Sequence, residues 1–452
     1  MSHTTAFPES VPASGRTEAS RADEAEQQVV AKVSRRLLWF IFLLFVFSFL
    51  DRINIGFAGL TMTRDLGLTS TQFGLATTLF YIAYIACGIP GNMALARFGA
   101  RRWIGAIMVA WGLASTATMF ATDASTLYLL RVLVGITEAG FLPGMLVYLT
   151  LWFPPAYRAR ANALFMIAMP VTAAIGSAVS GYILSLDGAW NLAGWQWLFM
   201  LEGLPSVLLG LAVFWYLDDK PQQAAWLSAD EKAVLARSLQ TGAAAPAAAA
   251  GKGLLAELCS PIVLKFALAY FCLVNTLAMV AVWAPLIVKS FSANASNQTV
   301  GLLAAIPQVV TVAAMIVWGR RSDRRQERRW HLALPMLAAA AGWMLTAMSA
   351  SPMVQLLGVC LASAGSYTAM SIFWTTPDQA LSPQARALGI AVINAIGNIG
   401  SALNPLVVGW LRDTTHSFTA GLLYAAALMA AGVLFVFLLP LDQGVRRPSA
   451  RQ

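Results

Sequence analysis

Four ionisable residues stand inside long apolar runs, and these residues are the best suited to chemistry. Asp51 and Arg52 lie late in a run that begins near Leu37, and Arg131 and Glu138 lie in another run. A charge inside hydrocarbon is costly, so such residues are usually paired, face a cavity and have a function. A guanidinium can hold a carboxylate with two parallel hydrogen bonds, and a buried carboxyl group can take up a proton. The four residues therefore predict a site that binds an anion and holds protons.

The chain around these residues has the composition of an integral membrane protein. It is 58% hydrophobic and 11% charged, with a mean hydropathy of +0.66, whereas a soluble domain carries roughly a quarter charged residues. Apolar runs of roughly 20 residues recur, and a helix of that length crosses a bilayer. Because a helix satisfies its own backbone in lipid, we predict an all-α integral membrane protein embedded in the lipid bilayer.

The apolar runs predict twelve transmembrane helices. The expected spans are 37–58, 74–95, 103–121, 125–150, 161–185, 196–217, 262–288, 299–318, 331–349, 353–375, 387–411 and 418–440. The net charge of +9 comes from basic residues that cluster in alternate loops, a pattern that fixes membrane orientation and argues against nucleic acid as a partner. Twelve spans, with Lys32, Arg35 and Arg36 before the first, place both termini in the cytoplasm.

The spans divide the chain into five parts. We expect a disordered cytoplasmic tail at 1–34, a six-helix bundle at 35–217, a cytoplasmic linker at 218–260, a second six-helix bundle at 261–441 and a cytoplasmic tail at 442–452. Within the linker, Ser228 and Glu231 have the spacing of a capping box, which predicts a short surface helix. The four cysteines have no metal-binding spacing, and we expect them to serve packing.

The two bundles repeat one another in sequence. Three patterns recur at a nearly constant separation, close to half the chain length: Ala96 with Asp323, Arg160-Ala161 with Arg386-Ala387, and Ile175-Gly176-Ser177-Ala178 with Ile399-Gly400-Ser401-Ala402. Two packed repeats with a site between them near mid-membrane are typical of transporters that work by rocking.

The sequence resembles the major facilitator superfamily. The loop after the eighth span matches its Gly-x-x-x-Asp-Arg motif at Gly319, Asp323 and Arg324, whereas the copy after the second span departs from it at Asn92, Ala96 and Ala100. Three further segments are similar to the anion:cation symporter family: Phe49-x-Asp51-Arg52-x-Asn54-Ile55, Arg131-x-x-x-Gly135-x-x-Glu138-Ala139-Gly140-Phe141-x-Pro143-Gly144, and Trp152-Phe153-Pro154 with Arg158-Ala159-Arg160-Ala161. The run from Trp195 to Pro205 is similar to members that move tartrate, phthalate and hydroxyphenylacetate.

This resemblance implies the major facilitator fold and proton-coupled import of a small organic carboxylate by alternating access. It implies a monomer in a bacterial inner membrane, with the proton gradient as energy source and no cofactor. An aromatic acid, a tartrate-like diacid and a sugar acid all fit, because an arginine recognises a carboxylate and does not distinguish the rest of the molecule.

Helix geometry gives the depths of the charged residues, and their chemistry suggests a role for each. Asp51 lies roughly 21 Å along its span and Arg131 roughly 9 Å from the opposite end of its own, which gives the two residues similar depths. We expect Arg52 to anchor the substrate, Asp51 and Glu138 to hold protons, and Arg131 to pair with Asp51 or Glu138 and to change partner. Alternatively, the four residues form structural salt bridges between the first and fourth spans.

Other residues are weaker candidates for the site and for a gate. Lining residues would be Tyr84, Trp374, Asn394 and Asn398, for which packing and interhelical hydrogen bonding are the alternatives. A cytoplasmic gate would comprise Arg97, Arg101, Arg102, Asp323 and Arg324, for which the alternative is charge that only sets orientation.

Several rival functions remain open. Within transport, the alternatives are an organic-anion exchanger and a drug exporter, although buried arginines favour an anionic substrate. A membrane sensor would need an output domain, and the largest soluble piece is 218–260. An enzyme is not expected, because His3, His331 and His416 belong to no visible set of nucleophile, base and orienting residue.

Overall fold

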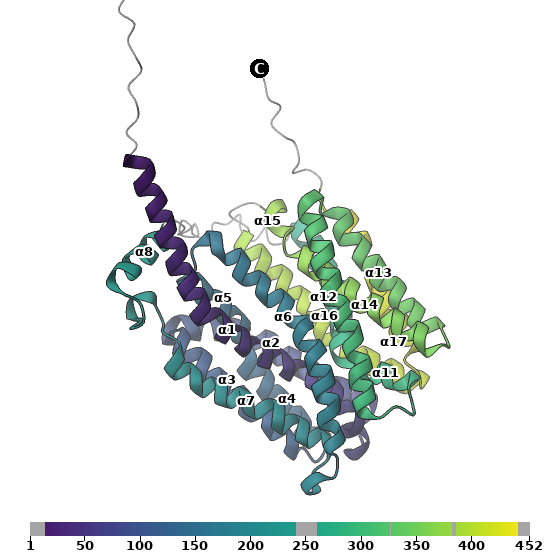
Figure 1. Ribbon diagram of the computed structural model, residues 1–452. Coiled ribbons are helices and arrows are strands. Elements are labelled where there is room, and N and C mark those ends of the chain that lie inside the picture. Colours follow the sequence, from purple (N-terminus) through teal and green to yellow (C-terminus); the bar gives the residue numbers. More distant parts are fainter. Residues whose placement is uncertain (1–13, 241–259, 326, 382–385, 442–452) are drawn as a thin grey trace, which may run out of the picture.

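The computed structural model describes residues 14–240, 260–325, 327–381 and 386–441, and these residues form a helical bundle (Figure 1). The helices of the N-terminal half are α1 (Ser14–Asp65), α2 (Ser70–Phe98), α3 (Ala100–Ala117), α4 (Ala124–Glu138), α5 (Phe141–Trp152), α6 (Pro155–Ile183) and α7 (Gly194–Tyr216). Those of the C-terminal half are α10 (Pro261–Ala278), α11 (Ala284–Phe291), α12 (Asn297–Arg325), α13 (Arg329–Met348), α14 (Pro352–Phe373), α15 (Pro377–Ala380), α16 (Arg386–Thr415) and α17 (Thr419–Phe437).

The predicted spans are confirmed. Within the described residues, eleven helical segments are long and apolar enough to cross a membrane, and α2 completes the twelve. Two spans are less regular than the sequence predicted. The fourth is divided into α4 and α5 at Ala139 and Gly140, and the seventh contains a π-helix at Met279–Trp283 between α10 and α11.

The segment before the first span also differs from the prediction. Residues 14–34, expected within a disordered tail, form the start of α1, because Val29, Val30 and Val33 are buried. This part of α1 packs beside α8 (Ala229–Gln240). The predicted capping box of α8 is present, since the Ser228 N–H donates to Glu231 Oε2 at 2.8 Å and the Glu231 N–H donates to Ser228 Oγ at 3.2 Å.

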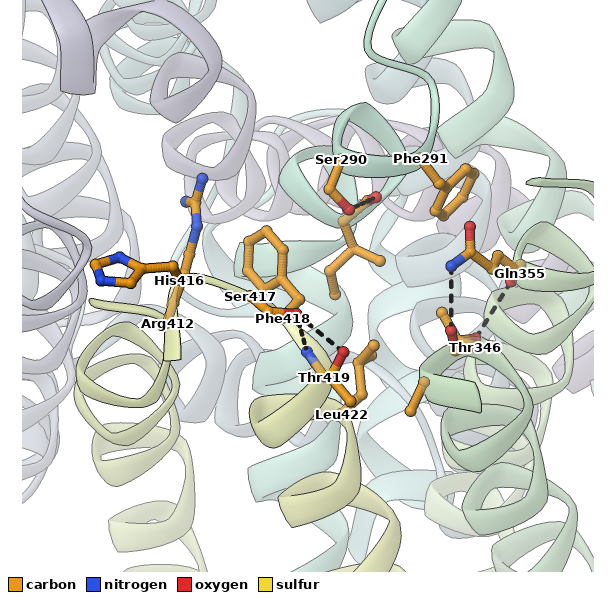
Figure 2. Close-up of a pocket in the computed structure, with 12 residues that line it drawn as sticks. Ser290, Phe291, Thr346, Gln355, Arg412, His416, Ser417, Phe418, Thr419 and Leu422 are labelled. Atoms are coloured by element: carbon orange, nitrogen blue, oxygen red, sulfur yellow. Dashed lines mark hydrogen bonds between the residues drawn. The ribbon is translucent and has the colours of Figure 1, made fainter. Parts of the chain in front are cut away.

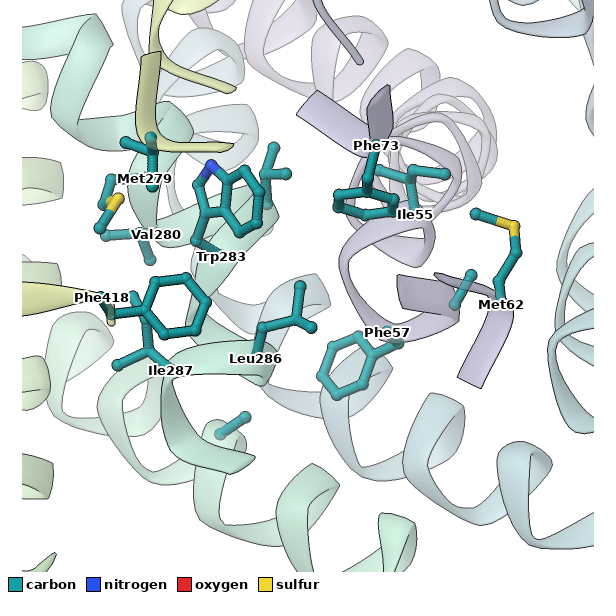
Figure 3. Packing of buried hydrophobic residues seen from close by; sticks show 14 of the residues in the cluster. Ile55, Phe57, Met62, Phe73, Met279, Val280, Trp283, Leu286, Ile287 and Phe418 are labelled. Atoms are coloured by element: carbon teal, nitrogen blue, oxygen red, sulfur yellow. The ribbon is translucent and has the colours of Figure 1, made fainter. Parts of the chain in front are cut away.

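We call the end of the bundle where α1 begins and α17 ends the terminal face, and the opposite end the far face. The two halves are joined toward the far face. Apolar residues of α1 and α2 pack there with residues of η5 (Met279–Trp283), α11 and the start of α17 (Figure 3). Polar contacts add to this closure: Asp413 of α16 accepts hydrogen bonds from the start of α2, and Thr78 Oγ1 donates to the Ala402 carbonyl at 2.6 Å. The bundle is therefore closed at its far face.

Candidate functional site

Glu138 and Arg52 form an ion pair between α4 and α1. The Asp123 carboxylate caps the start of α4 by accepting from the N–H groups of Ser125 and Thr126, and Glu138 is the last residue of that helix. Arg52 Nε lies 2.5 Å from Glu138 Oε1, and Ser48 Oγ donates to the same oxygen at 3.2 Å. The Glu138 side chain is 1% exposed and that of Arg52 is 21% exposed, so the guanidinium is the accessible member of the pair.

The break after Glu138 depends on a close approach of two helices. A Cβ atom at Gly140 would lie 2.8 Å from Trp103 Nε1, and one at Gly91 of α2 would lie 3.0 Å from the Gly140 Cα. Larger residues would push α2 and α3 away from the end of α4. The two glycines thus allow α2 and α3 to pack closely against the end of α4, beside Glu138.

Tyr84 of α2 completes the surroundings of Arg52. The Arg52 guanidinium carbon lies 4.6 Å from the centre of the Tyr84 ring, a cation–π contact. The predicted association of Tyr84 with the substrate-anchoring arginine is therefore geometrically possible. Tyr84 and Glu138 therefore hold the guanidinium from two helices, α2 and α4.

Asp51 adjoins Arg52 in sequence but lies inside the N-terminal half. Consecutive residues of a helix point about 100° apart, and Asp51 is directed toward α3 and α7. Its carboxylate accepts from Trp111 Nε1 at 3.0 Å, Ser115 Oγ at 2.9 Å, Ser206 Oγ at 2.9 Å and Asn54 Nδ2 at 3.3 Å. These donors come from three helices, so Asp51 is a buried junction within one half.

Arg131 does not form the predicted ion pair with Asp51 or Glu138. Hydroxyl, indole and amide donors occupy the Asp51 carboxylate, and Arg52 takes Glu138 Oε1. Arg131 is 2% exposed and lies 5.7 Å from the Phe80 ring centre and 6.0 Å from that of Phe199. Within the described residues its Nε and Nη2 atoms have no hydrogen-bond partner. A buried cation with unused donors favours a nearby anion.

Aromatic residues bring the C-terminal half to this site. The Tyr270 ring of α10 lies 4.9 Å from that of Trp374. Tyr270 of α10 faces Tyr84, and Tyr367 of α14 faces Tyr81, both of α2 in the other half. That Trp374 and Tyr84 line one site stays a prediction. Our sequence reasoning missed Tyr81, Tyr270 and Tyr367, because a lone tyrosine in an apolar run carries no distinguishing signal.

Asn394 and Asn398 lie on one face of α16, as their spacing predicted. Asn398 Nδ2 donates to the Asn394 carbonyl at 2.8 Å and to Asn394 Oδ1 at 3.0 Å. Asn394 is exposed and Asn398 half-buried. Their described contacts connect them to each other and not to the four charges, so their part in binding stays a prediction.

The predicted gate residues lie at the terminal face. Arg97, Arg102 and Arg324 are exposed. The backbone N–H of Arg101 donates to Asp219 Oδ1 at 2.8 Å, and its guanidinium donates to the Phe214 carbonyl. Asp323 pairs with Arg328 at 3.1 Å. Each of these three contacts lies within one half. A gate role stays a prediction.

The sequence reasoning missed a fifth buried ionisable residue, Glu202 of α7. It is 2% exposed and accepts from Ser180 Oγ at 2.7 Å, while its Oε2 atom has no hydrogen-bond partner among the described residues. Glu202 lies in the seventh helical segment of the N-terminal half, within the predicted span 196–217. A charge inside an apolar run is the signal that marks the first four residues, and Glu202 carries the same signal.

One cavity lies away from these charges. It has a volume of about 330 Å³ and opens between the far ends of α11, α13, α14, α16 and α17, with Arg412, His416 and Gln355 among its lining residues (Figure 2). A cavity of about 20 Å³ lies between the halves and is lined by Ile53, Ser177, Gln308 and Tyr367, among others. In the described part of the chain, no group of three or more His, Cys, Asp or Glu residues is placed to hold a metal ion.

Comparisons with known proteins agree with this architecture. Residues 41–405 and 267–452 match the family model described as Major Facilitator Superfamily. Two Agrobacterium vitis proteins, each named "Putative tartrate transporter", are 39% and 40% identical over 92% of this chain and cover 92% and 95% of their own lengths. The "Quinolone resistance transporter" of Acinetobacter baumannii is 32% identical over 91% of this chain and 95% of its own. A bacterial homologue of the human lysosomal transporter Spinster, solved in an inward-facing, occupied conformation, has a TM-score of 0.72 at 17% identity and covers 89% of this chain and 96% of its own.

Proposed function

Since this chain belongs to the major facilitator superfamily of membrane transporters, we propose that it imports a small organic carboxylate together with protons by alternating access. We place it among the anion:cation symporters of that superfamily. The proton gradient supplies the energy, and the transporter works as a monomer.

The observation that carries this proposal is the competition for Arg52. Its guanidinium is partly exposed and is held by Glu138. A substrate carboxylate needs the same donors, so it binds best when Glu138 is protonated and releases Arg52. Proton uptake and substrate binding then favour one another, which is the requirement for symport.

Arg131 supports the same proposal from a second position. Its unused donors and its aromatic surroundings form a positive site that a second anionic group would stabilise. Two arginines fit a substrate with a carboxylate and a further acceptor, such as a tartrate-like diacid. The names of the Agrobacterium vitis relatives favour the diacid over aromatic and sugar acids.

We propose that the terminal face is cytoplasmic and that the membrane is the bacterial inner membrane. Arg97, Arg101, Arg102 and the arginines from Arg320 to Arg329 lie at the terminal ends of their helices, which agrees with the positive-inside rule. Both termini are then cytoplasmic, and the structure, closed at its far face, is an inward-facing state.

One specific observation favours a second candidate. The relative named for quinolone resistance keeps a drug exporter under consideration. The two functions predict opposite dependence on substrate charge, because buried arginines repel a cationic drug that lacks a carboxylate.

The test is proton movement in proteoliposomes that carry no initial pH gradient. Tartrate, phthalate, hydroxyphenylacetate, a gluconate-type acid and a cationic dye are added outside in turn, and the pH of the bath is recorded. We expect the bath to become alkaline with one class of acid in wild-type vesicles and to stay unchanged in Arg52→Gln vesicles. Acid flux without proton movement would overturn symport, and a response to the dye alone would favour the exporter.

A further inference from the structure

The buried charges of the N-terminal half do not balance. Arg52 and Arg131 are the cations, and Asp51, Glu138 and Glu202 are the acids. If every group were ionised, the cluster would hold one negative charge without a partner in a membrane interior. That arrangement is strongly unfavourable, so one carboxyl group is neutral.

The contacts indicate which carboxyl group is neutral. Glu138 has Arg52 as a direct partner, and Arg131 interacts through space with Asp51 and Glu138. Glu202 instead faces the Ser180 hydroxyl, the Asn54 amide and the Asp51 carboxylate. Its surroundings contain no cation among the described residues, and a second carboxyl group adds repulsion.

The hydrogen bonding leads to the same residue. Glu202 Oε2 and Asn54 Oδ1 are both buried acceptors without a donor in the described part of the chain. Because the Asn54 side chain lies within hydrogen-bonding range of Glu202, a proton on Glu202 is a donor that Asn54 Oδ1 can accept. Asn54 Nδ2 donates in turn to Asp51 Oδ1 at 3.3 Å. One added proton therefore completes a continuous network from α7 to α1.

We propose that Glu202, joined to Asp51 through Asn54, is a second proton-binding site, separate from the Arg52–Glu138 pair. This deepens the proposed function and rests on it for the link to transport. Asp51 and Asn54 of the network belong to α1. The groups that face it are Trp111 and Ser115 from α3, Arg131 and Glu138 from α4, Ser180 from α6 and Ser206 from α7.

The Glu202–Asn54–Asp51 network adjoins Arg52, the residue proposed to anchor the substrate. Asp51 precedes Arg52 on α1, so any change in the proton shared by Glu202 and Asp51 alters the hydrogen bonds that fix this turn of α1. The substrate does not need to contact Glu202. Its position on α7, against α6, also connects the network to the helix that meets α12 of the other half.

The direct test is infrared difference spectroscopy of the purified, full-length protein. A protonated carboxylic acid has a C=O band that a carboxylate lacks. We expect such a band at neutral pH in the wild type and its loss in Glu202→Gln. Ser180→Ala, the matched control, removes one hydrogen bond to Glu202 and leaves the acid, so the band should persist and shift to higher frequency.

The outcomes separate this proposal from the proposed function. A band that stays in Glu202→Gln, or that does not move in Ser180→Ala, overturns a proton on Glu202, and the Ser180→Ala measurement suffices if the first variant does not fold. These results hold whether or not any acid is transported. In proteoliposomes we expect Glu202→Gln to exchange substrate within about threefold of the wild-type rate, because it loses at most part of one hydrogen bond, and to move fewer protons per substrate. An unchanged proton-to-substrate ratio would remove Glu202 from coupling.

Discussion

Arg52 Nε lies 2.5 Å from Glu138 Oε1, which places the best carboxylate-binding group of the chain in direct contact with a group that can be protonated. The pair joins α1 to the last residue of α4. Arg52 cannot use all its donors on a substrate while Glu138 is ionised. Proton binding at Glu138 and substrate binding at Arg52 therefore depend on one another. This dependence can be tested by substituting either residue.

Glu138→Gln should separate binding from coupling. Glutamine carries no charge, so Arg52 is permanently released from its ion pair and the substrate should bind more tightly than to the wild type. Isothermal calorimetric titration measures this affinity. We also expect the variant to retain exchange and to lose proton-driven accumulation. Intact accumulation would remove Glu138 from the coupling mechanism.

Arg52→Lys should weaken binding although it keeps the charge. Lysine lacks the planar fork that holds a carboxylate and that stacks on Tyr84. Hydrogen bonds to charged groups contribute about 1.5–3 kcal/mol, so we expect the dissociation constant to rise by roughly tenfold or more. Arg64→Lys is the matched control, because its pair with Asp65 is exposed. Equal affinities in wild type and Arg52→Lys would contradict the anchor role.

The sequence predicted the fold because each span carries its own signal. The apolar runs, the basic loops and the repeat all depend on local composition, and the helices from α1 to α17 follow them. The break between α4 and α5 and the π-helix after α10 carry no such local signal. The break at Ala139 depends on the contact of Gly140 with Trp103, and the π-helix at Met279–Trp283 lies against α1, so both require tertiary packing.

The charged residues of the site could be predicted from the sequence, but the groups with which each of them forms hydrogen bonds and ion pairs could not. Asp51, Arg52, Arg131 and Glu138 stood out because charge in hydrocarbon is rare, and depth along a helix follows from counting residues. Which way each side chain points depends on neighbours from α3 and α7, such as Trp111 and Ser206. In this state Glu138 pairs with Arg52, and the predicted pairing of Arg131 with a change of partner stays a prediction.

Asp413→Asn should loosen the closure of the far face. The Asp413 carboxylate accepts from the Ser70 N–H at 2.9 Å, the Thr71 N–H at 2.7 Å and Thr71 Oγ1 at 2.6 Å, and it therefore caps α2 across the two halves. Loss of the charge weakens these bonds and their interaction with the helix dipole. We expect the population open at the far face to grow by roughly tenfold.

Spin labels at Arg64→Cys and Thr414→Cys, in a background without the native cysteines, can measure that population by double electron–electron resonance. The long-distance component should grow in Asp413→Asn. Asp187→Asn is the control, because Asp187 accepts from the Gly194 N–H within one half. Identical distance distributions in wild type and Asp413→Asn would show that Asp413 does not hold the face closed.

The contact between α1 and α8 should weaken in acid. Lys32 Nζ donates to both oxygens of Glu231 at 2.8 Å, and this bond, with that from the Ser228 N–H, holds the pKa of Glu231 below its ordinary value of 4.5. A carboxylate with a lowered pKa stabilises the folded state fully above its unfolded pKa and loses that contribution as the pH falls through the lower, folded value. The loss should therefore begin near pH 4.5 and continue below it.

Hydrogen exchange of the α8 amides, corrected for intrinsic rates, should accelerate by about two- to fivefold across this window, the range of a partly exposed ion pair. Glu231→Gln should remove the acceleration and Asp230→Asn, at an exposed neighbour on the same helix, should keep it; acceleration that persists in Glu231→Gln would assign it to another group.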